Sequence, residues 1–250
     1  MKIMFRLGLV SISFRDKTPL EIIKAAADAG LSCIEWGSDV HAPFSDTKKL
    51  TEIKKECEAN GITCCSYGTY YKIGQNTDSE IMPYIEAAKI LGTDVLRLWC
   101  GTKGAAEYTD DEKKALYDRC IRLSQIAQKE NVRLCLECHN NTLTDTADET
   151  VKLMNTVNSP NFKMYWQPNQ YKNENENLDY AKKISGITEI IHAFNWDGDN
   201  KYPLGKAKEI WRKYLGVFGG GTVLLEFMPD GKIESLAGEA AALRKITEVF

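Results

Sequence analysis

Two glutamates stand alone in apolar stretches of the chain. Glu137 lies in the run Val132–Cys138 and Glu226 in the run Thr222–Phe227, and both runs have the short apolar pattern of a buried β-strand. A buried carboxylate is costly unless it is ion-paired, hydrogen-bonded or bound to a metal. Two carboxylates that face each other can act as general acid and base on one carbon, or as two ligands of one cation. Although a structural ion pair with Arg97 or a lysine is the alternative, we take the two glutamates as the candidate catalytic pair.

Short strand-type runs alternate with longer helical stretches along the whole chain. Strands are predicted at Ile3–Ile12, Ser32–Trp36, Thr63–Tyr67, Val95–Trp99, Val132–Cys138, Phe162–Trp166, Glu189–Asn195 and Thr222–Phe227. Helices are predicted at 18–29, 47–60, 78–91, 110–130, 146–157, 175–185, 203–216 and 232–248. Eight strand–helix units without a linker or a composition break predict one α/β domain over residues 1–250, a closed parallel (β/α)₈ or TIM barrel. An open doubly wound sheet is disfavoured because no GxGxxG follows the first strand, and for the same reason no nucleotide cofactor is expected.

The composition narrows the class of protein and its compartment. The 250 residues carry a net charge of −3, which gives no electrostatic footprint for nucleic acid or for an anionic membrane surface. The N-terminal run MKIMFRLGLVSISF contains Arg6 and no cleavage motif, so we do not expect a signal peptide. No stretch reaches the ~20 apolar residues of a membrane span. Eight cysteines without an export signal predict reduced thiols and a cytoplasmic protein.

Cys135 and Cys138 form a CxxC pair, a spacing that ligates zinc in other contexts. Here both cysteines lie in one predicted strand, where a separation of three residues places the two sulfurs on opposite faces. We therefore expect them, like Cys64 and Cys65, to be small buried hydrophobic residues.

Polar and aromatic residues collect at the predicted carboxyl ends of the strands, where TIM barrels carry their active sites. The candidates for substrate binding are Glu35, His41, Tyr67, Arg97, Trp99, His139, Asn141, Gln167, His192 and Trp196. Indole and phenol rings with polar neighbours suit the apolar faces and hydroxyl edges of sugars or polyols. Strand alternation directs Trp99 and Trp196 toward the cavity, whereas Trp36 and Trp166 are expected in the core beneath the helices.

Several passages carry a family resemblance that extends from the first strand to the last. They are GLSCIEWGSDVH, VLRLWCG, LECHNNTLTDT, YWQPN and VLLEF. On these passages the chain resembles the xylose isomerase-like TIM barrels, which include sugar-phosphate isomerases and epimerases, hydroxypyruvate isomerase, inosose dehydratase and endonuclease IV. The resemblance implies the barrel fold, a small sugar or polyol substrate, and one divalent metal held by Glu, Asp, His and Glu at successive strand ends.

By motif position, the resemblance assigns the two glutamate ligands, which also move the proton in epimerases, to Glu137 and Glu226. The Asp position holds Gln167, and the His position falls on Phe194, two residues after His192. An amide oxygen can bind Mg²⁺ or Mn²⁺ but brings no charge. Glu137, Glu226 and Gln167 are thus the candidate ligands for Mn²⁺, Mg²⁺, Co²⁺ or Zn²⁺, and the two changed positions leave open whether a metal binds.

The leading interpretation is a sugar or polyol isomerase or epimerase that moves a proton α to a carbonyl. An inosose-type dehydratase, which would remove water with the same glutamates, and a non-catalytic sugar-binding protein with a degenerate metal site are the alternatives. DNA repair of the endonuclease IV kind is disfavoured, because its three-zinc cluster is rich in His and Asp and this chain has three histidines.

Overall fold

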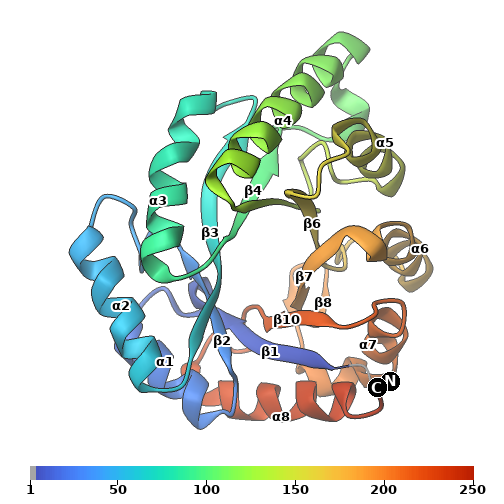
Figure 1. The fold of residues 1–250 in the computed structure, drawn as a ribbon. Coiled ribbons are helices and arrows are strands. Elements are labelled where there is room, and N and C mark those ends of the chain that lie inside the picture. Colours follow the sequence, from blue (N-terminus) through green and yellow to red (C-terminus); the bar gives the residue numbers. More distant parts are fainter. Residues whose placement is uncertain (1–3) are drawn as a thin grey trace.

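Eight parallel strands form a closed barrel with helices around it (Figure 1) in the computed structural model, which describes residues 4–250. The strands are β1 (Phe5–Val10), β2 (Cys33–Gly37), β3 (Thr63–Ile73), β4 (Val95–Cys100), β5 (Arg133–Glu137), β6 (Phe162–Trp166), β7 (Thr188–Ala193) and β10 (Gly221–Leu225). Each strand pairs with the next along the chain, and β10 closes the ring by pairing with β1. The predicted TIM barrel is confirmed.

The helices cover the outside of the barrel and follow the strands in sequence. They are α1 (Pro19–Asp28), α2 (Thr47–Ala59), α3 (Met82–Leu91), α4 (Asp110–Glu130), α5 (Ala147–Val157), α6 (Glu174–Ile184), α7 (Lys208–Leu215) and α8 (Leu236–Thr247). Thr18 begins α1 with a capping box, in which its hydroxyl accepts from the Glu21 N–H and Glu21 accepts from the Thr18 N–H. Within residues 4–250, no helix is long and apolar enough to cross a membrane.

The first and third strands differ from their predicted extents. The predicted start of the first strand, Ile3, lies outside the described residues, and β1 ends at Val10 because Ser11–Phe14 form a short 3₁₀ helix. The third strand runs on past its predicted end, Tyr67, as far as Ile73, with an irregular register against β4. The residues between Tyr67 and Ile73, which we expected to lie in a loop, therefore belong to a strand.

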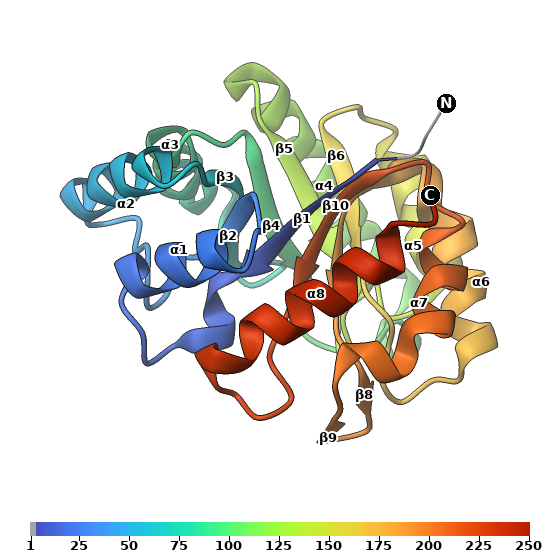
Figure 2. The ribbon, with the colours of Figure 1, turned by 90° about the horizontal axis from the view of Figure 1, so that it is seen from below.

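A small two-stranded ribbon was not predicted. It consists of β8 (Trp196–Asp197) and β9 (Asn200–Lys201), which pair antiparallel in the loop after β7. Figure 2 shows the ribbon projecting from the end of the barrel opposite the chain termini. The ribbon fixes the loop that carries Trp196 over that end of the barrel.

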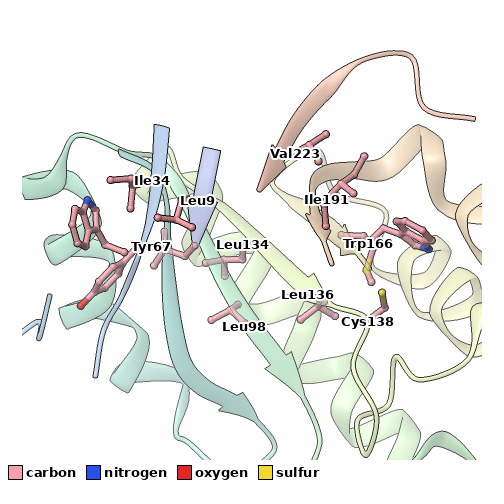
Figure 3. Packing of buried hydrophobic residues seen from close by; sticks show 14 of the residues in the cluster. Leu9, Ile34, Tyr67, Leu98, Leu134, Leu136, Cys138, Trp166, Ile191 and Val223 are labelled. Atoms are coloured by element: carbon pink, nitrogen blue, oxygen red, sulfur yellow. The ribbon is translucent and has the colours of Figure 1, made fainter. Parts of the chain in front are cut away.

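Successive side chains of β5 point alternately into the barrel and toward the surrounding helices. Cys135 belongs to the apolar cluster inside the barrel, whereas Leu134, Leu136 and Cys138 belong to the cluster outside it (Figure 3). The two sulfurs of the CxxC pair thus lie on opposite faces, and all eight cysteines are free thiols. Glu137 has the inward parity of Cys135, so it points into the ring.

Two of the tryptophans serve the core, as predicted. Trp36 and Trp166 are fully buried. Trp166 packs on rings from the α7 region, with centroid distances of 6.0 Å to Trp211, 5.1 Å to Tyr214 and 5.5 Å to Phe218. These contacts attach the sheet to its helical layer on the β6–β7 side.

Gly8 marks a position in β1 that admits no side chain. A Cβ there would lie 2.4 Å from the Cys33 carbonyl oxygen, which belongs to the backbone and cannot move aside. We expect Gly8→Ala to lower the free energy of unfolding by about 1–3 kcal/mol through overpacking. Gly186→Ala, at a position with nothing within 4 Å, should change it by less than about 0.5 kcal/mol. Urea unfolding followed by tryptophan fluorescence measures both, and equal stabilities would contradict the argument.

Candidate active site

The carboxyl ends of the strands surround a cavity of about 420 Å³. Its wall comes from β3 and β4 and from the segments that follow β1, β5, β6, β7 and β10. Arg97, Glu137, Gln167 and Glu226 are among the lining residues. The volume falls in the range of small-molecule sites.

Two carboxylates and an imidazole meet at this end of the barrel. Glu137 ends β5, His192 lies in β7 and Glu226 follows β10, and one ligand atom from each lies within 4.8 Å of the others. His192 Nδ1 is 3.5 Å from a carboxylate oxygen of each glutamate and 3.2 Å from Gln167 Oε1. Donors from four separate strand ends therefore converge on one point.

The two oxygens of Glu137 have different partners. Its Oε2 accepts hydrogen bonds from Arg97 Nη1 and from Trp99 Nε1, both at 2.5 Å. Its Oε1 faces His192 Nδ1. Burial would raise the pKa of Glu137, but the positive charges of Arg97 and His192 outweigh burial and lower it well below its usual value. The partners of Glu137 therefore favour its ionised form, and Oε1 is the oxygen that Arg97 and Trp99 leave to other groups.

Arg97 also binds a second, deeper carboxylate. Glu35 is fully buried, and it accepts from Arg97 Nε at 2.9 Å and from Ser66 Oγ at 2.7 Å. Since Glu35 and Arg97 belong to β2 and β4, their ion pair must cross over β3, and it does so at Gly68. A Cβ on Gly68 would lie 2.7 Å from Glu35 Oε1 and 2.9 Å from Arg97 Nη2, so only glycine leaves room for the pair.

The buried acidic and basic groups shift one another's pKa values toward the charged forms. Burial disfavours the charged form of each group, yet Arg97 and His192 lower the pKa of Glu35 to about 2. Burial would lower the pKa of His192, but Glu226, Glu137 and Glu35 raise it well above its usual value. Three carboxylates and two cations thus form one network, called here the charge cluster: Glu35, Arg97, Glu137, His192 and Glu226.

The ten predicted substrate-binding residues divide into three groups. Six line the cavity: Arg97, Trp99, His139, Asn141, Gln167 and Trp196. Glu35 and His192 do not line it and instead belong to the charge cluster. The parity argument that directed Trp99 and Trp196 toward the cavity agrees with their positions.

His41 and Tyr67 require a correction, because neither reaches the cavity. His41 is buried between Ser11 Oγ and the Phe14 carbonyl oxygen, each 3.2 Å from a ring nitrogen. Tyr67 is buried and donates its hydroxyl to the Ala42 carbonyl oxygen at 2.6 Å. Both side chains hold the loop after β2 against the barrel.

The candidate metal ligands also change. His192, rather than Gln167, completes the group with Glu137 and Glu226, and the Gln167 amide oxygen is a fourth neighbour. The side chain at Phe194 lines the cavity and packs on Trp196, with ring centroids 4.7 Å apart. Once His192 has released its proton, two carboxylates, one imidazole and one amide oxygen make a donor set that fits a divalent cation of the Mn²⁺ or Zn²⁺ type.

Several residues of the site carried little or no usable sequence signal. Ser66 and Gly68 lie in the middle of a strand, and neither residue type by itself indicates a site. Tyr70, whose place after the predicted end of the third strand did suggest the active-site end, lines the cavity from within β3. Phe227 also lines the cavity, and its backbone is left-handed, with φ 52°. A phenylalanine rarely adopts this conformation, so its residue type does not predict it.

The charge cluster has a consequence for acid stability. A carboxylate whose pKa is lowered on folding stabilises the protein above its unfolded pKa, near 4.5, and this contribution is lost as the pH falls toward the folded value, about 2 for Glu35. We expect Glu35→Gln to cost about 3–5 kcal/mol at pH 7, because buried Arg97 loses one of its two charged partners. Between pH 4.5 and 2 the variant should lose less stability than the parent protein.

Urea unfolding at several pH values measures both effects. Glu52→Gln, at an exposed position on α2, is the control and should follow the parent curve. Parallel curves for the parent and Glu35→Gln proteins would show that Glu35 does not carry the lowered pKa.

The sequence matches the family described as xylose isomerase-like TIM barrel over residues 23–229. The 3-dehydroshikimate dehydratase of Bacillus anthracis is 28% identical over 166 residues, which cover 63% of this chain. The match spans 59% of that enzyme's length, less than two thirds.

Solved structures of low sequence identity share the fold. The probable 3-DHS dehydratase AsbF of Bacillus anthracis has a TM-score of 0.79 at 18% identity, covering 97% of this chain and 98% of that one. The IOLI protein with a binding zinc atom has a TM-score of 0.78 at 18% identity, covering 98% and 99%. A D-psicose 3-epimerase from Clostridium cellulolyticum H10, solved with D-tagatose, has 0.74 at 16% identity, covering 98% and 99%. Because the family match spans most of the chain and the structure is the closed eight-stranded barrel, this chain belongs to the xylose isomerase-like TIM-barrel family.

Proposed function

We propose that this chain is an enzyme that moves a proton next to the carbonyl of a small sugar or polyol. The observation that carries the proposal is the convergence of Glu137, His192 and Glu226, within 4.8 Å, beside a cavity of about 420 Å³. Two buried carboxylates beside one substrate-sized cavity are the arrangement that general acid–base catalysis on carbon requires. The family match supports the same class of chemistry.

A divalent cation held by Glu137, His192 and Glu226, with Gln167 as a neutral fourth donor, would polarise the substrate carbonyl and acidify the adjacent C–H. Glu137 presents Oε1, because Arg97 and Trp99 occupy Oε2. Glu226 supplies the second carboxylate. It follows β10, which is separated from β5 by β7 and β6 in the barrel. Trp99 and Trp196 flank the space and keep water from the reacting carbon.

The first test is hydrogen exchange. D-fructose, D-tagatose, D-allulose and scyllo-inosose are each incubated in D₂O with protein supplied with Mn²⁺, and carbon-bound deuterium is followed by NMR. At least one should exchange a C–H adjacent to its carbonyl. Glu226→Gln and Glu137→Gln should each slow the exchange by about 10²–10⁴-fold, the usual contribution of a positioned acid or base.

Glu52→Gln is the control for that series, since this glutamate is exposed on α2, and it should exchange at the parent rate. If the parent protein binds a sugar tightly but exchanges no proton and releases no product, it is a sugar-binding protein and the catalytic proposal is wrong.

Metal uptake gives an independent test. Titration calorimetry with Mn²⁺ and Zn²⁺ should show about one ion per chain, and Glu137→Gln, Glu226→Gln and His192→Ala should each weaken binding by about 10–100-fold or more. Gln167→Ala should have the smallest effect of the four, because an amide brings no charge. Unchanged affinity in the Glu226→Gln protein would place the ion elsewhere.

The second candidate is a dehydratase, which the 28% identity to the 3-dehydroshikimate dehydratase favours. The first step would be the same removal of a proton next to a carbonyl, followed by loss of a β-hydroxyl as water. Mass spectrometry separates the two candidates, because only dehydration gives a product lighter by one water molecule. 3-Dehydroshikimate is the first substrate to offer.

A further inference from the structure

We propose that the cavity selects an uncharged, unphosphorylated ring compound that carries several hydroxyl groups and a carbonyl, and rejects anionic ring compounds. This inference rests on the first proposed function, proton transfer on a sugar, and stands against the dehydratase candidate, because 3-dehydroshikimate is an anion. It goes beyond the proposed function by naming the charge and shape of the substrate. Three features carry it: the pairing of the cavity's basic groups, the contents of the place where TIM barrels bind phosphate, and the chemistry of the two facing walls.

Both arginines that line the cavity are already neutralised. Arg97 is ion-paired with Glu35 and Glu137, and Arg15 is ion-paired with Asp39 and donates to the Tyr70 hydroxyl at 2.5 Å. Two lysines lie near the rim without lining the cavity: Lys72 Nζ is 5.2 Å from the Trp99 ring centroid, and Lys201 Nζ is 4.8 Å from those of Trp196 and Phe227. No lysine lines the cavity from the described part of the chain.

The carboxylates of the cavity oppose an anion directly. Glu137, Asp145 and Glu226 all line it. A divalent cation held by Glu137 and Glu226 would be matched in charge by these two ligands, and Asp145 would still face the substrate. A phosphate or carboxylate group entering here meets negative charge, and no lysine or unpaired arginine of residues 4–250 lines the cavity to offset it, which is unfavourable at short range in a partly buried site.

The place where many TIM barrels bind phosphate is filled by other groups. That place is formed by the loops after the seventh and eighth strands, with the start of a short extra helix. Here the loops after β7 and β10 contribute an aromatic platform, defined as Phe194, Trp196 and Phe227, with successive ring centroids 4.7 and 5.6 Å apart. The backbone N–H of Phe227 donates to Ser13 Oγ at 2.9 Å and is not free for a ligand.

In the loop after β10, the carboxylate of Asp230 lies next to the start of the short 3₁₀ helix Ile233–Ser235. Asp230 accepts from the Lys232 N–H at 3.0 Å and from the Ser235 hydroxyl at 2.7 Å. Two of the donors at this turn, the Lys232 N–H and the Ser235 hydroxyl, are thus occupied by Asp230.

The two walls of the cavity complement a polyol ring instead. The aromatic platform offers an apolar face. The segments after β5 and β6 supply an amide wall, defined as Asn140, Asn141, Gln167, Asn169 and Gln170, all of which line the cavity. Neutral amides donate and accept equally, so they suit hydroxyl groups and discriminate little in favour of an anion. A ring with one apolar face and an edge of hydroxyls fits between these walls.

Matched pairs of ligands test the charge of the substrate. The pairs are D-fructose and D-fructose 6-phosphate, myo-inositol and its 1-phosphate, and methyl shikimate and shikimate. Binding is measured by calorimetry with and without Mn²⁺. In at least one pair the neutral member should bind at least tenfold more tightly than its anionic partner, and in no pair should the order reverse.

Two variants test the walls. Trp196→Leu should weaken binding of the neutral ligand about tenfold, whereas Tyr202→Leu, an exposed aromatic that does not line the cavity, should bind as the parent does. Gln170→Lys adds a free cation to the amide wall and should raise affinity for the anionic members at least tenfold. No gain in the Gln170→Lys protein would count against the inference.

The outcomes separate this inference from the proposed function. Tighter binding of an anionic member by the parent protein overturns the inference alone, because proton transfer on an anionic substrate at the same glutamates would still stand. Binding of no member of any pair, with or without Mn²⁺, overturns the inference and the proposed function together.

Discussion

The ion pairs of Arg97 with Glu35 and Glu137 are the constraint on which the site depends. One guanidinium binds a carboxylate from β2 through Nε and a carboxylate from β5 through Nη1, so it joins strands that do not touch. A charge this deeply buried is tolerated only when it is paired and hydrogen-bonded on every side. Arg97 therefore fixes which oxygen of Glu137 is left for other partners, and its charge lowers the pKa of that carboxylate.

β3, which lies between β2 and β4, leaves room for the ion pair of Glu35 and Arg97. Ser66 and Gly68 are the two inward positions of β3 that lie beside Glu35 and Arg97 in the strand register. Ser66 is small enough to turn its hydroxyl to Glu35, and Gly68 leaves the gap through which the ion pair passes. The position of Glu137 thus depends on β3, a strand to which Glu137 does not belong.

The barrel and the two glutamates could be predicted because they depend on local pattern. A lone charge in an apolar run, as at Glu137 and Glu226, is informative by itself, and alternation then predicts its direction. Glu35 is a lone charge of the same kind, but its partner lies 62 residues away, and only the folded chain shows that it lies beneath the cavity rather than in its wall. His41 was misplaced for a similar reason, since the course of a loop does not follow from periodicity.

The glutamine at position 167 is explained by the balance of charge in the cluster. Three buried carboxylates already face the two cations Arg97 and His192. A fourth carboxylate at position 167, with its oxygen about where Gln167 Oε1 lies 3.2 Å from His192, would add a negative charge that only a bound cation could neutralise. The amide keeps the same oxygen in place without that charge. The charges of the cluster are then closer to balance without an ion, and a divalent cation bound here would be held less tightly than by an all-charged ligand set.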